Sequence, residues 1–203
     1  WNKDDKDLKL NRERHYGFIN YTSALAADHC FFNSQYHMNS FLHDLKAFLK
    51  VYPDHRNMNT IEEISEKSKV LYLGLELKRF EKYNKDVKIN DKPVFLWNHR
   101  WDHDKNPEAF IEVFKALHDK GLDFELIIAG EEFKYAKETF HNLKIHLGKK
   151  VIHFGYAKSF EDYARLLHKA DYLPVTSNQD FFGISIAEAM YCKCIPILPE
   201  RLT

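Results

Sequence analysis

Cysteine is scarce in this sequence: three residues in a chain of 203 are too few for a disulfide framework. That scarcity is typical of a reducing compartment, so the sequence predicts a cytoplasmic protein. No apolar run approaches the ~20 residues that a membrane-spanning helix needs. The first residues also lack the basic, apolar and small-residue pattern of a secretory signal. We therefore expect no association with a membrane.

An excess of charge of either sign is also missing. Lys plus Arg and Asp plus Glu both number 30, which gives a formal net charge of zero. A general nucleic-acid coat needs a basic excess to displace counterions, so the balance argues against that class and leaves a local basic patch open.

Two nucleotide-binding fingerprints are absent as well. The chain has neither Gly-x-Gly-x-x-Gly nor Gly-x-x-x-x-Gly-Lys-Ser/Thr. Their absence argues against a dinucleotide-dependent dehydrogenase and against a P-loop NTPase.

What is present is the composition of a globular protein, 44% apolar and 30% charged. The chain starts at Trp1 without Met and stops at Thr203 just after a strand-like run, so we expect a piece of something longer. Residues 1–14 are polar and read as a loop or arm. The remaining pattern up to residue 75 predicts part of one domain, with helices at 16–27, 34–51 and 61–67 and strands at 29–33 and 70–73. The charged segment 76–92 reads as a linker.

Residues 93–203 show a cleaner pattern of strands alternating with helices. Asn106 with Pro107, and Ser159, are typical of helix starts, and Gly121 is typical of a helix end. Because the strands are continuously apolar, both faces of their sheet must be covered. The sequence therefore predicts an α/β fold with Rossmann-like doubly wound parallel sheets, whose ligands bind where the strands end. The expected strands are 94–97, 124–129, 151–154, 172–176 and 194–198.

A first candidate binding segment follows the first of these strands. Arg100 and Lys105 lie five residues apart in a loop that leads into a helix. Two cations at a ligand edge suit a diphosphate, whose charge is spread over several oxygens. A solvated charged loop would give the same pattern.

A second candidate segment runs from Asp180 to Glu188. Gly183 opens a helix there, and the free N–H groups of a helix start attract phosphate or sugar oxygens. Glu188 lies about 7–8 Å further along the helix axis, so the two carboxylates could hold two parts of one long polyol ligand. A helix cap at Asp180 and a surface or core-edge glutamate at Glu188 are the plain alternative. The turn at Gly130 and Glu131, after the second strand, is a weaker third candidate.

The same region also contains patterns typical of metal sites and a pair of cysteines. Asp102-x-Asp104 has the form of a divalent metal motif, but three-residue motifs are common by chance. His99 and His103 have ligand spacing only on a helix and lack a third ligand nearby. For Cys192 and Cys194, buried packing is the better interpretation.

These motifs together resemble the group 1, or family 4, retaining glycosyltransferases. The resemblance covers roughly residues 93–203 and rests on order and spacing: Arg100-x-x-x-x-Lys105, Gly130-Glu131, Phe154-Gly155, Ala170-Asp171 and Asp180-Phe-Phe-Gly-x-x-x-x-Glu188-Ala. The family writes its acidic pair as Glu, seven residues, Glu, so Asp180 is a departure. Its side chain is shorter by about one bond, ~1.5 Å.

The N-terminal third narrows the resemblance to the tRNA-queuosine mannosyltransferase family. The segments that carry it are Arg14-His-Tyr-Gly-Phe-Ile-Asn20, Ala26-Ala-Asp28, Phe32-Asn-Ser34, Met38-Asn-Ser-Phe41, Pro53-Asp-His-Arg56, Trp97-Asn-His-Arg-Trp101 and His103-Asp-Lys-Asn-Pro107. The upstream motif His-Glu-Asn-Gln of that family is not in this chain. The resemblance thus implies a fragment.

The resemblance implies a GT-B fold, with residues 1–75 the remainder of the acceptor-side domain and 93–203 a nearly complete donor domain. GDP-mannose would be the donor, queuosine in a tRNA anticodon the acceptor, and no metal would be needed. Arg100 and Lys105 would hold the diphosphate, Asp180 the transferred sugar and Glu188 the ribose. The remaining donor contacts would come from Gly130, Glu131, Phe182, Gly183 and Ile184. As a fragment, the chain would bind donor weakly and catalyse nothing.

Two alternatives stay open at this stage. One is a glycosyltransferase with a lipid or saccharide acceptor, although no basic amphipathic helix is evident. The other is a non-catalytic nucleotide-binding or scaffold protein, which the shortened Asp180 keeps open. A sugar-phosphate enzyme such as a phosphorylase is a weaker option on the same architecture.

Overall fold

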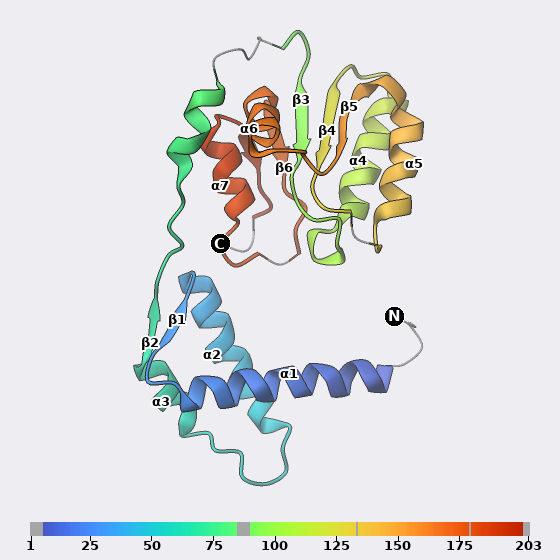
Figure 1. Ribbon diagram of the computed structural model, residues 1–203. Coiled ribbons are helices and arrows are strands. Elements are labelled where there is room, and N and C mark those ends of the chain that lie inside the picture. The colour runs from blue at the N-terminus through green and yellow to red at the C-terminus, as the bar shows by residue number, and fades with distance from the viewer. Residues whose placement is uncertain (1–5, 85–89, 133, 179, 201–203) are drawn as a thin grey trace. The chain divides into compact units, whose positions relative to one another are not determined.

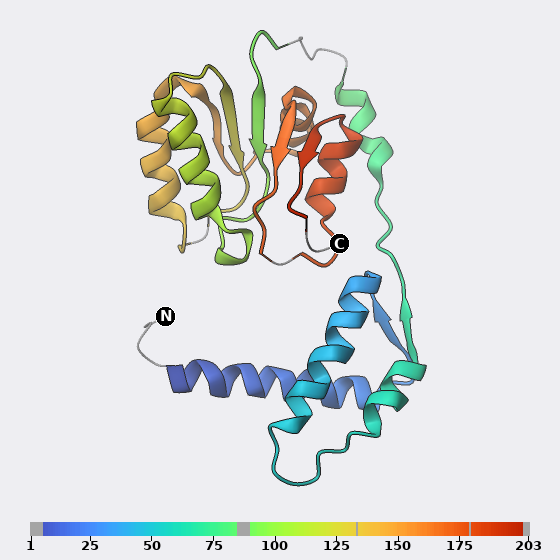
Figure 2. The ribbon, with the colours of Figure 1, turned by 180° about the vertical axis from the view of Figure 1, so that it is seen from behind.

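The computed structural model describes residues 6–84, 90–132, 134–178 and 180–200 of the chain (Figures 1 and 2). It divides into two compact units, with the boundary between Gly74 and Leu75. No helix within those described ranges is both long and apolar enough to cross a membrane.

The first unit packs helices against a short parallel pair of strands. Strand β1 pairs with β2 in the register Cys30 to Ser68 and Phe32 to Val70. Apolar side chains from all three helices form its core, with Ile64 fully buried. The elements are α1 (Lys6–Ala26), β1 (Cys30–Phe32), α2 (Gln35–Lys50), α3 (Thr60–Glu66) and β2 (Ser68–Val70).

The predicted arm at residues 1–14 is wrong for its described part. Helix α1 already begins at Lys6 and continues to Ala26. The segment from Lys6 to Arg14 lacks an apolar period but is rich in Lys, Leu, Arg and Glu, which are good helix formers. The absence of an apolar period predicts that the segment has no apolar face to bury, and it does not exclude a helix.

The second unit is built on a parallel sheet of strand order β5-β4-β3-β6-β7. This confirms the predicted alternation of strands and helices, and the order places β3 at the centre of the sheet. Its strands are β3 (Val94–Trp97), β4 (Glu125–Ala129), β5 (Val151–Gly155), β6 (Tyr172–Pro174) and β7 (Ile195–Ile197). Its helices are η1 (Leu77–Tyr83), η2 (His103–Lys105), α4 (Pro107–Asp119), α5 (Lys137–Leu147), η3 (Gly148–Lys150), α6 (Phe160–Lys169) and α7 (Ile184–Tyr191).

Helices cover both faces of this sheet, and two separate cores result (Figures 1 and 2). Successive side chains of a strand point to opposite faces. Val94 and Leu96 accordingly join the core beneath α6 and α7, whereas Trp97 joins the core beneath α4 and α5. Every residue of β3 therefore contacts one core or the other, which explains why the strand reads as a continuous apolar run.

The predicted helix starts of this unit are confirmed by their capping bonds. The Asn106 side chain accepts a hydrogen bond from the backbone N–H of Ala109 at 3.3 Å, with Pro107 opening α4. The Ser159 side chain accepts one from Asp162 N–H at 3.1 Å. These caps fix where α4 and α6 begin, and so fix the loops that precede them.

The linker interpretation of residues 76–92 fails where the structure describes this segment. Residues 77–83 form η1, which packs on α6. Phe80 is fully buried against Phe160, with ring centroids 4.9 Å apart, and its carbonyl oxygen contacts His168 Nε2 at 2.9 Å. One buried aromatic residue among charged neighbours is sufficient to dock a short helix. A search for apolar periodicity along the sequence does not detect a single residue of this kind.

Candidate functional site

The ligand edge of the second unit is where its parallel strands end, and three loops meet there (Figure 1). The loop after β3 carries Arg100 and Lys105. Hydrogen bonds tie it to the loop after β6: Asn178 N–H donates to the Asp104 carbonyl at 2.9 Å, and Thr176 Oγ1 donates to the Lys105 carbonyl at 2.8 Å. These hydrogen bonds hold the backbone of the predicted cationic loop in place.

Gly130 permits a close approach between two backbone segments. Its φ is +119°, and a Cβ added to it would lie 2.1 Å from the carbonyl oxygen of His99. Only glycine fits such a backbone position. Next to it, Trp101 N–H donates to the Glu131 carbonyl at 3.1 Å. The loops after β3 and β4 are thus joined backbone to backbone.

The two predicted cations belong to a network with two carboxylates. Lys105 Nζ lies 3.2 Å from Asp104 Oδ2 and 3.1 Å from Asp180 Oδ2. Arg100 Nη2 lies 3.6 Å from Asp104 Oδ2. The lysine is largely buried and the guanidinium side chain is 52% exposed. The structure therefore brings Arg100, Lys105 and Asp180 together, as the sequence predicted, and adds Asp104 between the cations.

Glu188 is the second carboxylate of the predicted acidic pair, and it is 8% exposed. It accepts a hydrogen bond from Tyr163 OH at 2.9 Å and an ion-paired one from Arg79 Nη2 at 3.0 Å. Burial and the neighbouring Glu188 carboxylate raise the pKa of Tyr163 well above its usual range, so this phenol stays a donor. Of the two plain readings of Glu188, the surface position is wrong, whereas the core-edge position agrees with its burial.

His99 lies behind the cationic loop and is 4% exposed. Its Nδ1 contacts Ser185 Oγ at 3.1 Å, and its ring meets Trp97 edge-on at 5.4 Å. Burial, reinforced by the positive charge of Lys105, lowers the pKa of His99 to about 4. The imidazole is therefore neutral at physiological pH and adds no charge to the network.

A cavity of about 530 Å³ opens at this edge. The predicted site residues on its wall are Arg100, Gly130, Glu131 and Glu188. Those outside its wall are Lys105, Asp180, Phe182, Gly183 and Ile184. Gly183 is the N-cap residue of α7, which confirms its predicted place at the helix start; its φ is +75°, and Ile184 is 43% exposed.

Sequence reasoning missed three side chains that organise this site. Arg79 lies in η1, within the segment that the sequence predicts to be a linker, and Tyr163 lies on α6. Asn98 stands directly after β3, where its Nδ2 donates to the Ser185 carbonyl at 2.8 Å. Its place at the strand end is a signal that could have identified it. No comparable signal marks Arg79, because its role depends on how η1 docks.

The structure shows the surroundings of the residues that could otherwise bind a metal, and of the two cysteines. Asp104 is already paired with Lys105 and Arg100, and Asp102 accepts a hydrogen bond from His103 N–H at 2.8 Å. His99 is buried whereas the His103 side chain is 73% exposed, so the two rings occupy different environments. Cys192 and Cys194 are buried, as expected, and burial raises the pKa of each to about 12.

Comparison with known proteins identifies the family. Residues 79–200, more than half of the chain, match the model of the glycosyl transferases group 1. The chain belongs to the group 1 glycosyl transferases. Residues 4–75 of this group 1 chain match a second model, the tRNA-queuosine alpha-mannosyltransferase N-terminal region.

Relatives agree with this assignment. The chain is 36% identical over 198 residues to the tRNA-queuosine alpha-mannosyltransferase of Drosophila melanogaster, covering 94% of this chain and 52% of that protein. This group 1 chain thus spans about half the length of the curated relative.

Solved structures share the fold at low identity. The Anabaena protein HepE in complex with UDP-glucose superposes with a TM-score of 0.62 at 18% identity, over 90% of this chain and 48% of that one. Sucrose-phosphate synthase from Thermosynechococcus elongatus superposes with a TM-score of 0.60 at 18% identity, over 89% of this chain and 42% of that one. These similarities confirm the predicted α/β class of GT-B type.

Proposed function

We propose that this protein is a retaining hexosyltransferase that moves mannose from GDP-mannose to queuosine in tRNA without a metal ion. The observation that carries the proposal is the match of residues 4–75 to the N-terminal model of tRNA-queuosine alpha-mannosyltransferases. The group 1 match alone supports sugar transfer and leaves the acceptor open. A cytoplasmic location stays a prediction from the sequence.

The cationic network is suited to the diphosphate of the donor. Arg100 presents a half-exposed guanidinium toward the cavity, and Lys105 stands behind it beside Asp104. Donors and cations placed in advance stabilise the charge that develops on a leaving diphosphate, and they need no reorganisation during the reaction. The pairing of Asp104 with both cations supports the metal-free form of the proposal, since this carboxylate is already neutralised.

Glu188 is suited to hold the ribose of the donor. A carboxylate has about four lone-pair sites, and Arg79 and Tyr163 use two of them. The others can accept hydrogen bonds from two ribose hydroxyls. The fixed carboxylate therefore acts as a pre-organised acceptor on the cavity wall.

Asp180 is suited to the transferred sugar because it reaches Lys105 at the same edge. An aspartate in place of the family's glutamate is compatible with this role if the sugar lies closer to the backbone, so that its hydroxyls reach the shorter side chain. Asp180→Glu is expected to retain transfer activity, and Asp180→Asn to lose most of it.

The test is transfer of radiolabelled mannose from GDP-mannose to queuosine-containing tRNA by the polypeptide at its natural length, with EDTA present. Arg100→Ala is expected to reduce transfer by about 100-fold or more. Arg165→Ala is the matched control, because Arg165 is similarly exposed and, like Arg100, pairs with a carboxylate four residues away. We expect its activity to be unchanged.

Each part of the proposal has its own contrary result. Preference for UDP-glucose would refute the donor, and equal transfer to tRNA lacking queuosine would refute the acceptor. Loss of activity in EDTA would refute the metal-free mechanism. If no sugar is transferred to any acceptor while GDP still binds, a nucleotide-binding scaffold is the better description.

A further inference from the structure

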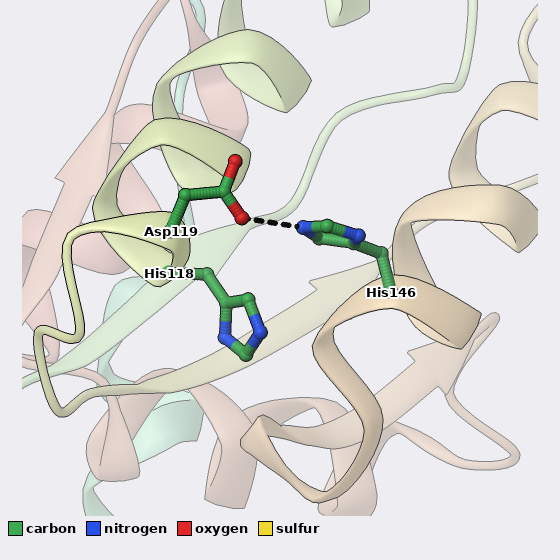
Figure 3. Close-up of side chains that lie close together, drawn as sticks. All are labelled: His118, Asp119 and His146. Carbon is green, nitrogen blue, oxygen red and sulfur yellow. Dashed lines mark hydrogen bonds and ion pairs between the residues drawn. The ribbon is translucent and has the colours of Figure 1, made fainter.

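We infer that the second unit carries a binding site for a divalent transition-metal ion of the Zn²⁺ class, formed by His118, Asp119 and His146 (Figure 3). Each residue offers one ligand atom, and these atoms all lie within 4.8 Å of one another. The inference is independent of the proposed function and concerns a different part of the molecule.

The three ligands come from two neighbouring helices. His118 and Asp119 end α4, and His146 lies in the last turn of α5. Figure 3 shows the three side chains turned toward a shared space between these helices. His146 Nε2 lies 3.0 Å from Asp119 Oδ1, and the rings of His118 and His146 meet with centroids 5.0 Å apart.

The spacing is close to what a tetrahedral ion requires. Zn²⁺ binds imidazole nitrogen and carboxylate oxygen at about 2.0–2.2 Å, which places neighbouring ligand atoms roughly 3.4 Å apart. The Asp119 and His146 side chains are 62% and 41% exposed, so small rotations can close the remaining distance. Their exposure also leaves room for water as a fourth ligand.

The donor set selects the kind of ion. Two imidazoles and one carboxylate suit Zn²⁺ and its neighbours, whereas Mg²⁺ and Ca²⁺ prefer oxygen ligands throughout. In the described part of the chain, His118 Nδ1 is buried and has no hydrogen-bond partner. Coordination by this ring therefore breaks no hydrogen bond through that nitrogen.

The described ranges contain a second three-residue group, Asp102, His103 and Asp104, which is the weaker candidate. Its Asp104 carboxylate is engaged by Arg100 and Lys105, and its three members are consecutive residues at the start of η2. The His118 group bridges two helices and contains a single acid, Asp119, whose printed ion pair among the described residues is with His146, itself a ligand.

The position of the site indicates a structural role. Helices α4 and α5 run back from the ligand edge, so their C-terminal ends lie at the opposite edge of the sheet (Figure 1). A bound ion would join these two ends, and it would stabilise the folded unit by mass action. It would not contact a ligand held by Arg100 or Glu188.

The experiment is calorimetric titration of the chelator-stripped chain with ZnCl₂, with Co²⁺ absorption as a report on coordination. We expect saturable binding and a tetrahedral Co²⁺ spectrum. His118→Ala, His146→Ala and the near-isosteric Asp119→Asn should each weaken binding by at least about tenfold. GDP binding should be the same in all of them.

Two control variants make the result specific. His43→Ala removes an exposed histidine that contacts Asp44 at 3.1 Å and belongs to neither three-residue group found among the described residues, and the variant should bind Zn²⁺ like the parent. His103→Ala should also leave binding unchanged. Absence of saturable binding, or undiminished binding in His146→Ala and Asp119→Asn, would overturn the inference. Loss of binding in His103→Ala alone would place the ion in the other group and overturn it equally.

Discussion

Acidification should destabilise the second unit through a single buried side chain, His99. Its pKa is about 4 in the folded protein, whereas an unfolded histidine has its ordinary value of 6.5. Above pH 6.5 the ring is neutral in both states and the stability does not depend on it. As the pH falls below 6.5, His99 binds a proton in the unfolded chain but not in the folded chain, so the free energy of unfolding falls.

The magnitude follows from the two pKa values. A shift of one unit is equivalent to about 1.4 kcal/mol, and the difference here extends from 6.5 to about 4. The loss of stability relative to pH 7 should be about 1 kcal/mol at pH 6, about 2 at pH 5 and about 3 at pH 4. Because His99 is buried, solvent does not screen this penalty appreciably.

The assay is urea unfolding at each pH, followed by tryptophan fluorescence. A Trp1→Phe background leaves Trp97 and Trp101 as the reporters, and both are fully buried in the second unit. His99→Gln keeps a polar side chain of similar reach but does not titrate. The difference between the two pH profiles isolates the histidine from every carboxylate that titrates in the same range.

The expected outcome is a parent profile that falls by about 3 kcal/mol more than the His99→Gln profile between pH 7 and pH 4. Parallel profiles would refute the reasoning. So would a His99 resonance that titrates near pH 6.5 in the folded protein, because it would show that the imidazole is protonated in place without a burial penalty.

Three further results are expected from the same edge of the sheet. Gly130→Ala should lower the free energy of unfolding by at least about 3 kcal/mol, because its Cβ would meet a backbone carbonyl oxygen at 2.1 Å; Gly121→Ala, also at positive φ but in open space, should cost only about 1 kcal/mol in the same urea assay. Asp104→Asn should tighten GDP binding about fivefold by calorimetry, since one negative charge leaves the network that is proposed to hold the diphosphate, and weaker binding would contradict this. Tyr163→Phe should cost about 2 kcal/mol of stability, because it removes a 2.9 Å donor from a buried carboxylate; an unchanged urea midpoint would show that this bond contributes little.

Much of the second unit could be read from the sequence because its signals are local. The continuous apolar strands and the caps at Asn106 and Ser159 predicted the elements, and the parallel sheet of GT-B type is confirmed. The positions of Arg100, Lys105 and Asp180 at one edge followed from the rule that parallel strands end together. The sequence did not predict helix η1, because one buried phenylalanine docks a segment that is otherwise charged.

By itself, the sequence determined the class of fold, the ligand edge and the types of charge collected there, since periodicity and capping are properties of neighbouring residues. Only the tertiary structure decided how those charges are used. It placed Asp104 between two cations, Arg79 on Glu188, and the two histidines of the inferred metal site beside one another on separate helices. Such contacts join residues far apart in the chain, and their geometry depends on how whole elements pack.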